Sequence, residues 1–335
     1  MKYHELRTKI IRDAAKERIP VLGEFELTAR CNLACAMCYV VDQTAKDLST
    51  DTWLRIFKSA VDAGLLYAVL TGGEVFMRSD FVTLYNSLYD MGVRITLFSN
   101  GTHVPQHALD AFAKRPPENI TMTLYGASNA TYETVTGKRG AFDRLIKSLD
   151  ALEAARIPIT LRTLPLKPIY GDLDALIEFA KQRGLILHYA SYMGPTRQGN
   201  FDHASMRLTP EELVDYGQRI ERAFGKDATA TPTTSTKAAT CAALKSAYFV
   251  SFEGMMQPCA LAMKPARSVL DDTVENTFKA LLNPFADVER YDGCASCRVK
   301  DDCMQCYARR LLEGDANACA PYLKVHATLK GRAKP

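Results

Sequence analysis

Between residues 23 and 189, six short apolar runs rich in β-forming residues alternate with amphipathic segments. The predicted strands are Glu24–Thr28, Tyr67–Thr71, Arg94–Ser99, Ile120–Tyr125, Ile159–Leu164 and Leu185–Tyr189. Predicted helices between them include Thr52–Ala63, Phe81–Met91, Ala141–Ala155 and Leu173–Arg183, whose apolar residues recur every three or four positions. This alternation predicts an α/β fold with a parallel sheet and right-handed crossovers, either doubly wound or a complete or partial barrel.

Polar and glycine-rich segments follow these strands directly. They cover residues 28–38, 71–74, 99–101 and 126–128. In both architectures, loops after the carboxyl ends of the strands build the active site, so we expect the functional residues there. Further along, Thr209 followed by Pro210 predicts the start of another helix.

Composition excludes several classes of protein. The 335 residues include 42 Lys and Arg and 38 Asp and Glu, a net charge of +4 that is too small to indicate nucleic acid or a membrane surface as partner. No apolar stretch approaches the length of a membrane span, and no signal peptide is visible. We therefore expect a cytoplasmic globular protein.

The ten cysteines are unevenly distributed. Cys31, Cys35 and Cys38 form one cluster, and the other seven all follow residue 240. Disulfides are the alternative, but clustered cysteines in an intracellular protein more often bind metal. Three thiolates in one loop are one fewer than structural zinc requires, and they would leave one iron of a four-iron cluster open to an exogenous ligand.

The first cluster resembles the Cys-x3-Cys-x2-Cys signature of radical S-adenosylmethionine (SAM) enzymes, which have a partial or full (β/α) barrel. Gly72, Gly73 and Glu74, after the second strand, are similar to the family motif that contacts the SAM amino group. Met37 takes the place of the residue that packs near adenine, with loop packing as the alternative role. The resemblance implies that the SAM-bound cluster generates a 5′-deoxyadenosyl radical, which abstracts hydrogen from a substrate C–H bond.

Other SAM contacts are less specific. Ser99 ends the third strand, and Thr123 and Ser128 flank the end of the fourth, in the region that contacts ribose in the family. Each could instead be a satisfied cap. Relatives often place an arginine for the SAM carboxylate near the position of Thr136, so the carboxylate partner is undetermined here.

The C-terminal cysteines resemble the seven-cysteine SPASM domain, although the spacing before Cys306 is one residue shorter than in that pattern. A zinc ribbon is the alternative, but its pairs are normally farther apart. The resemblance implies two auxiliary [4Fe-4S] clusters in addition to the SAM-binding one. Cys294, Cys297, Cys303 and Cys319 would hold the distal cluster, and Cys241, Cys259 and Cys306 the nearer one, its fourth iron open to substrate or capped by another residue.

The resulting domain prediction has five parts. They are an N-terminal extension (1–20), a radical SAM (β/α)6 core (21–226), a linker (227–240), a SPASM domain (241–322) and a basic tail (323–335). The auxiliary clusters are expected to accept an electron from the substrate radical, to staple a small domain, or both.

At the level of the family, the resemblance implies an oxidoreductase that modifies a ribosomally made peptide by a crosslink such as a thioether, or by another oxidation. The leader segment of the peptide would be bound by a separate protein or captured directly in the barrel, and a flavodoxin- or ferredoxin-type protein is the expected electron donor. The alternatives are a radical SAM dehydrogenase or decarboxylase acting on a small molecule, and a non-catalytic zinc- or iron–sulfur-binding interaction protein. Sulfatase-maturating relatives carry Asp at the position of Ala260, so a sulfatase-maturating activity is disfavoured here. Arg162 and Arg197 are interpreted as ordinary charged residues of loops, with substrate binding as the alternative.

Overall fold

The computed structural model describes residues 3–40, 44–225, 241–289 and 291–332. One nine-stranded sheet organises the chain, in the strand order β6-β5-β4-β3-β2-β1-β7-β8-β9. Its strands are β1 (Leu22–Glu26), β2 (Tyr67–Thr71), β3 (Arg94–Ser99), β4 (Asn119–Leu124), β5 (Ile159–Thr163), β6 (Leu187–Tyr189), β7 (Ala247–Val250), β8 (Met255–Gln257) and β9 (Arg267–Ser268). The first six are parallel in chain order, so the expected partial (β/α)6 barrel is confirmed.

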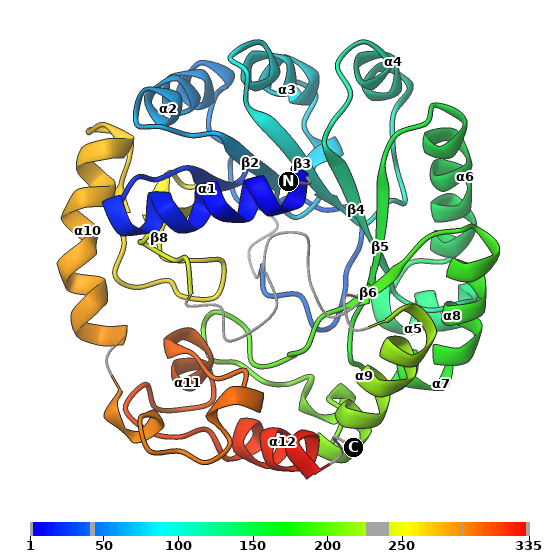
Figure 1. The fold of residues 1–335 in the computed structure, drawn as a ribbon. Helices are drawn as coiled ribbons and strands as arrows, with labels where there is room; N and C mark the ends of the chain where they lie inside the picture. Colours follow the sequence, from blue (N-terminus) through cyan, green and yellow to red (C-terminus); the bar gives the residue numbers. More distant parts are fainter. Residues whose placement is uncertain (1–2, 41–43, 226–240, 290, 333–335) are drawn as a thin grey trace.

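Helices cover the outer side of this sheet (Figure 1). The helices of the first 225 residues are α1 (Tyr3–Glu17), α2 (Thr50–Asp62), α3 (Phe81–Asp90), α4 (Gln106–Lys114), α5 (Asn129–Thr136), α6 (Ala141–Ala154), α7 (Lys167–Gly171), α8 (Leu173–Gln182) and α9 (Pro210–Phe224). Those of the C-terminal region are α10 (Val274–Glu289), α11 (Tyr307–Leu312) and α12 (Pro321–Arg332). Every strand and helix predicted between residues 23 and 189 is present, with ends displaced by at most two residues.

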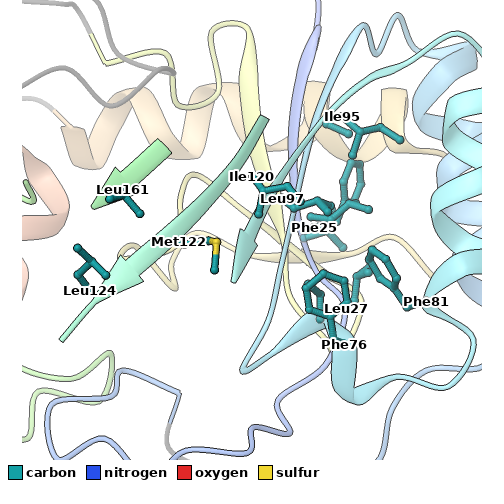
Figure 2. Packing of buried hydrophobic residues seen from close by; sticks show 14 of the residues in the cluster. Phe25, Leu27, Phe76, Phe81, Ile95, Leu97, Ile120, Met122, Leu124 and Leu161 are labelled. Carbon is teal, nitrogen blue, oxygen red and sulfur yellow. The ribbon is translucent and has the colours of Figure 1, made fainter. Parts of the chain in front are cut away.

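The two faces of the sheet bury different residues, because successive side chains of a strand point to opposite sides. On the outer face, Phe25, Leu97 and Met122 belong to the apolar core between the strands and the helices (Figure 2). Trp53 of α2 is fully buried there, with its ring edge-on to that of Phe25. This core holds the parallel strands together and fixes where their carboxyl ends lie.

On the inner face, the residues nearest the amino ends of β1 and β2 are apolar. Leu22, Tyr67 and Val69 form a small buried cluster, against which Ile10 and Ile11 of α1 pack. The expected N-terminal extension is therefore largely helix α1, which crosses one end of the barrel (Figure 1). The polar inner-face residues lie farther along the strands, toward the opposite end.

The C-terminal region is joined to the barrel through the sheet itself. Strand β7 pairs in parallel with β1, so the sheet continues past the predicted boundary at residue 241. Assignment of residues 21–226 and 241–322 to separate domains stays a prediction, and the linker at 227–240 lies outside the described residues. The predicted helix start at Thr209 is confirmed by a capping box at the start of α9.

The expected basic tail over residues 323–335 is wrong as far as Arg332, because this segment forms most of α12. Leu323, His326 and Ala327 are buried, and α12 packs against α9. Burial of this one face outweighs the basic composition that suggested a solvated tail. None of the helices in the described ranges is long and apolar enough to cross a membrane.

Candidate active site

The loop after β1 brings Cys31, Cys35 and Cys38 together. The thiols lie close enough to influence one another electrostatically, and all ten cysteines of the chain are free thiols in the structure. Burial raises the pKa of Cys31 to about 11 and that of Cys35 to about 12. Both thiols are therefore protonated at neutral pH without metal, and a bound metal would have to displace those protons.

Backbone hydrogen bonds fix the shape of this loop. The N–H groups of Ala34 and Ala36 donate to the carbonyls of Thr136 (2.9 Å) and Val135 (3.3 Å) at the end of α5. The Leu33 N–H points at Cys31 Sγ, at 3.4 Å. The end of α5 thus holds the segment between the cysteines in place.

Gly72 and Gly73 lie against the chain that leads into this loop. A Cβ on Gly72 would lie 2.7 Å from the Thr28 carbonyl oxygen, and one on Gly73 only 2.4 Å from the carbonyl oxygens of Ala29 and Arg30. The Gly73 N–H in turn donates to the Thr28 carbonyl at 2.8 Å. Only glycine allows this approach, which places the end of β2 directly beside the cysteine loop.

Glu74 is buried and organises the neighbouring strand end. Its carboxylate accepts hydrogen bonds from the Ser99 hydroxyl (2.9 and 3.0 Å) and from the Asn100 N–H (2.7 Å). Burial raises the pKa of Glu74 to about 7, although these hydrogen bonds oppose the shift. The side-chain amide of Asn100 donates to Asn32 at 2.8 Å and points at Cys31 Sγ at 3.7 Å. Glu74 and Ser99 are therefore connected to the cysteine loop through Asn100.

The other residues predicted to contact SAM have mixed surroundings. Met37 is partly buried against the main core, and Thr123 is partly exposed on the inner face of β4. Ser128 caps α5 by accepting from the Thr131 N–H at 3.2 Å. The Thr136 hydroxyl donates back to the Tyr132 carbonyl at 2.6 Å, so it is already used within α5.

Tyr125, which the sequence did not single out, directs its hydroxyl toward the Cys35 thiol. Its pKa is raised, chiefly by burial and then by the three nearby thiols. The only signal in the sequence was its place at the end of the predicted fourth strand, directly before the polar segment at 126–128.

The seven C-terminal cysteines fall into two further groups. Cys241 and Cys306 lie close enough to act electrostatically on Cys259, and Cys306 also acts on Cys241. Cys319, Cys294 and Cys297 act in the same way on Cys303. The two groups have the same members as the two ligand sets that the SPASM resemblance implies. Burial raises the pKa of Cys241 and Cys303, and that of Cys259 to about 12.

Gln305 lies between two thiols of the four-cysteine group. Its side-chain amide donates to Cys294 Sγ at 3.3 Å, and its carbonyl accepts from the Cys319 thiol at 3.5 Å.

In the described part of the chain, no three His, Cys, Asp or Glu side chains meet closely enough to hold a single metal ion. Groups of three, three and four thiols fit iron–sulfur clusters by their donor chemistry, since thiolates are the usual protein ligands of these clusters.

Charged side chains occupy the inner face of the sheet beside the cysteine loop. Arg197 forms an ion pair with Glu26 (3.0 Å), and both side chains are buried. The Arg197 guanidinium also donates to the Ala260 carbonyl at 2.6 Å and lies over the rings of Tyr39 and Phe249. Interpreting Arg197 as ordinary loop charge was therefore wrong. Glu24 and Glu26 are two positions apart in β1, with Phe25 between them, so both glutamates face the inside of the barrel. This spacing was the missed signal that could have predicted the inward-facing charge.

Known proteins share both the sequence and the fold of this chain. A model of the Radical SAM superfamily matches residues 25–180. The PqqA peptide cyclase of Rhizobium meliloti is 30% identical over 46% of this chain and 42% of its own length, so the chain spans less than half of that relative. The AdoMet-dependent heme synthase of Methanosarcina barkeri is 24% identical over 88% of this chain and 93% of its own length.

Among solved structures, SuiB of Streptococcus suis, determined with its precursor peptide SuiA, superposes with a TM-score of 0.72 at 14% identity, covering 95% of this chain and 80% of SuiB. SuiB has also been solved with bound SAM. The match to the Radical SAM superfamily supports SAM and the SAM-binding iron–sulfur cluster as cofactors of the barrel. Residues 25–180 therefore match the Radical SAM superfamily, and the chain as a whole has the fold of SuiB.

Proposed function

We propose that this protein is a radical SAM oxidoreductase of the SPASM type that modifies a ribosomally made peptide. The observation that carries the proposal is the meeting of the three-thiol loop with Gly72, Gly73 and Glu74 at one edge of the sheet. PqqA peptide cyclase and SuiB, with its precursor peptide, support a peptide as the substrate.

In this proposal, Cys31, Cys35 and Cys38 hold the first cluster and leave one iron for SAM. The glycines let the SAM methionyl group approach the backbone, and Glu74 accepts from its ammonium group, an anion–cation hydrogen bond. When bound, SAM and the reduced cluster supply a 5′-deoxyadenosyl radical that abstracts hydrogen from an unactivated C–H bond. Met37, Ser99, Thr123 and Ser128 are proposed to line the site. The polar inner face of the barrel positions the substrate carbon.

The two C-terminal thiol groups are proposed to hold one auxiliary [4Fe-4S] cluster each, giving three clusters in total. Oxidation of a peptide after hydrogen abstraction releases an electron, and the group of Cys241, Cys259 and Cys306 is the proposed first acceptor. A flavodoxin- or ferredoxin-type protein would reduce the SAM-binding cluster, and a separate protein would present the leader segment of the peptide.

A small-molecule substrate is the second candidate. It is favoured by the alignment with AdoMet-dependent heme synthase, which extends over 93% of that relative. Formation of 5′-deoxyadenosine distinguishes the two candidates. Stimulation by a cysteine-bearing peptide supports peptide modification, and the absence of any stimulation supports the small molecule.

The first test is to measure iron, sulfide and Mössbauer spectra of the anaerobically reconstituted protein, together with SAM cleavage by dithionite. We expect about twelve irons and 5′-deoxyadenosine. Changing Cys31, Cys35 and Cys38 to Ala should leave about eight irons and abolish SAM cleavage.

The matched control changes Cys294, Cys297, Cys303 and Cys319 to Ala. It should also leave about eight irons, but SAM cleavage should continue because the first cluster is intact. A protein that holds only zinc and leaves SAM intact would refute the proposal. About four irons, all lost with the first three cysteines, would refute the auxiliary clusters alone.

A further inference from the structure

Arg162 lies in the middle of β5 and faces the inside of the barrel. In the register of the sheet it stands beside Thr123 of β4 on one side and His188 of β6 on the other. Side chains in one such row point to the same face of a sheet. The structure therefore places Arg162 within a strand, among partly exposed polar side chains, and its interpretation as loop charge was wrong.

The guanidinium of Arg162 has no partner among the described residues. Its Nε is buried and donates no hydrogen bond, and no ion pair joins the guanidinium to a carboxylate of the described ranges. The groups that act on it most strongly are Tyr39, Glu24, Tyr125 and the like-charged Arg309. Burial lowers the pKa of Arg162, which means that the charge is poorly stabilised in its surroundings.

Arg197, on the same inner side, shows what a purely structural arginine looks like here. It has a carboxylate partner in Glu26, a carbonyl acceptor at Ala260 and aromatic rings on both sides. A guanidinium whose Nε is buried without a partner is costly, and the cost is offset when an anion binds. The forked donors of arginine fit a carboxylate in a bidentate arrangement, and Arg309 adds positive charge nearby.

We propose that Arg162 binds a carboxylate of the substrate, an aspartyl or glutamyl side chain of the modified peptide, and so selects peptides with an acidic residue near the reacting carbon. This inference rests on the proposed function. SAM also carries a carboxylate, but Arg162 stands on β5, three strands from the end of β2 where Gly72, Gly73 and Glu74 are proposed to meet the SAM methionyl group. Tyr39 and Tyr125, which act on Arg162, also lie near the cysteine loop, so the test below separates the two carboxylates.

The test measures binding of two blocked pentapeptides, four alanines around a central glutamate or glutamine, to the reconstituted protein with SAM present. The unaltered protein should bind the glutamate peptide about tenfold more tightly. Arg162→Gln should remove this preference, and Arg162→Lys, which keeps the positive charge, should retain part of it. Arg139→Gln is the matched control, because Arg139 is 91% exposed and pairs only with Glu133 at the surface, and it should keep the full preference.

Equal affinity for the two peptides in the unaltered protein, or a preference that survives in Arg162→Gln, would overturn the inference. Weaker SAM binding in Arg162→Gln with the peptide preference intact would also overturn it, by assigning the arginine to the SAM carboxylate. Iron content of every variant checks folding. SAM cleavage by the unaltered protein, measured on the same preparations, tests the proposed function separately from the peptide preference.

Discussion

At the scale of single residues, Gly73 connects the conformation of the backbone to the candidate active site. A methyl group there would lie 2.4 Å from two carbonyl oxygens of the chain that enters the cysteine loop, and backbone atoms cannot move aside as a flexible side chain would. We expect Gly73→Ala to lower the free energy of unfolding by about 1–3 kcal/mol and to reduce iron loading, as overpacking does elsewhere. Denaturant titration and iron analysis measure both effects.

Gly171 provides the control. A Cβ at Gly171 meets nothing within 4 Å, so Gly171→Ala should leave stability and iron content unchanged or slightly raised. If both glycine variants behave alike, close approach of the backbone is not the reason for glycine at position 73.

How far the sequence predicts the site also depends on single residues. Cysteine spacing and Gly72-Gly73-Glu74 are local patterns, so the three thiols and the adjacent turn could be predicted together. Ion pairs such as Glu26 with Arg197 join residues far apart in the chain, and they form only once the strands and the following loop are placed. No local pattern distinguishes Arg197, which has a carboxylate partner, from Arg162, which has no hydrogen-bond or ion-pair partner within the described part of the chain.

At the scale of elements, one buried ion pair links α11 and α12 to the segment before α9. Arg207 and Glu313 form a bidentate pair (2.6 and 3.1 Å), and the Tyr192 hydroxyl donates to the same carboxylate at 2.7 Å. The Arg207 guanidinium also lies over the ring of Tyr322 in α12. This pair joins the segment before α9 to the end of α11, and so positions the cysteines around α11.

Glu313→Gln leaves the Arg207 charge buried without its carboxylate. We expect a loss of about 3–5 kcal/mol in the free energy of unfolding, together with faster loss of iron from the proposed C-terminal clusters. The comparison is Glu133→Gln, which breaks an exposed pair with Arg139 and should cost no more than about 1 kcal/mol. Equal stability of the two variants in urea would contradict the role given to the buried pair.

The elements themselves were predictable to different degrees. Strands and helices of the barrel follow from periodicities of two and 3.6 residues, which are local properties of the chain. Helix α12 was not predicted, because its Lys and Arg residues indicate solvent and its buried face is defined only by contact with α9. For the same reason, the parallel pairing of β7 with β1 could not be read from the short run at 247–250.

At the scale of the whole molecule, this pairing should make the two halves of the chain unfold together. Tyr248 of β7 is buried between Phe25 of β1 and Phe278 of α10. Trp53, the single tryptophan, packs on the other side of Phe25 and reports on the N-terminal half. We expect Tyr248→Ala to lower the free energy of unfolding measured from Trp53 fluorescence by about 3–5 kcal/mol.

Leu311→Ala, at a 41% exposed position in the same C-terminal half, should shift that transition by less than about 0.5 kcal/mol. A Trp53 transition that is unchanged in Tyr248→Ala would mean that the N-terminal strands unfold independently of the C-terminal region.

The position of β1 between β2 and β7 also determines the order in which the protein can be completed during translation. The ribosome releases β1 early, and β2 pairs with it about 40 residues later, but its second neighbour begins only at Ala247. Until then, β1 has an open edge, the kind of surface at which nascent chains aggregate. The loop with Cys31, Cys35 and Cys38 leaves the ribosome next to this open edge, so iron delivered before residue 250 is synthesised would reach an unfinished barrel.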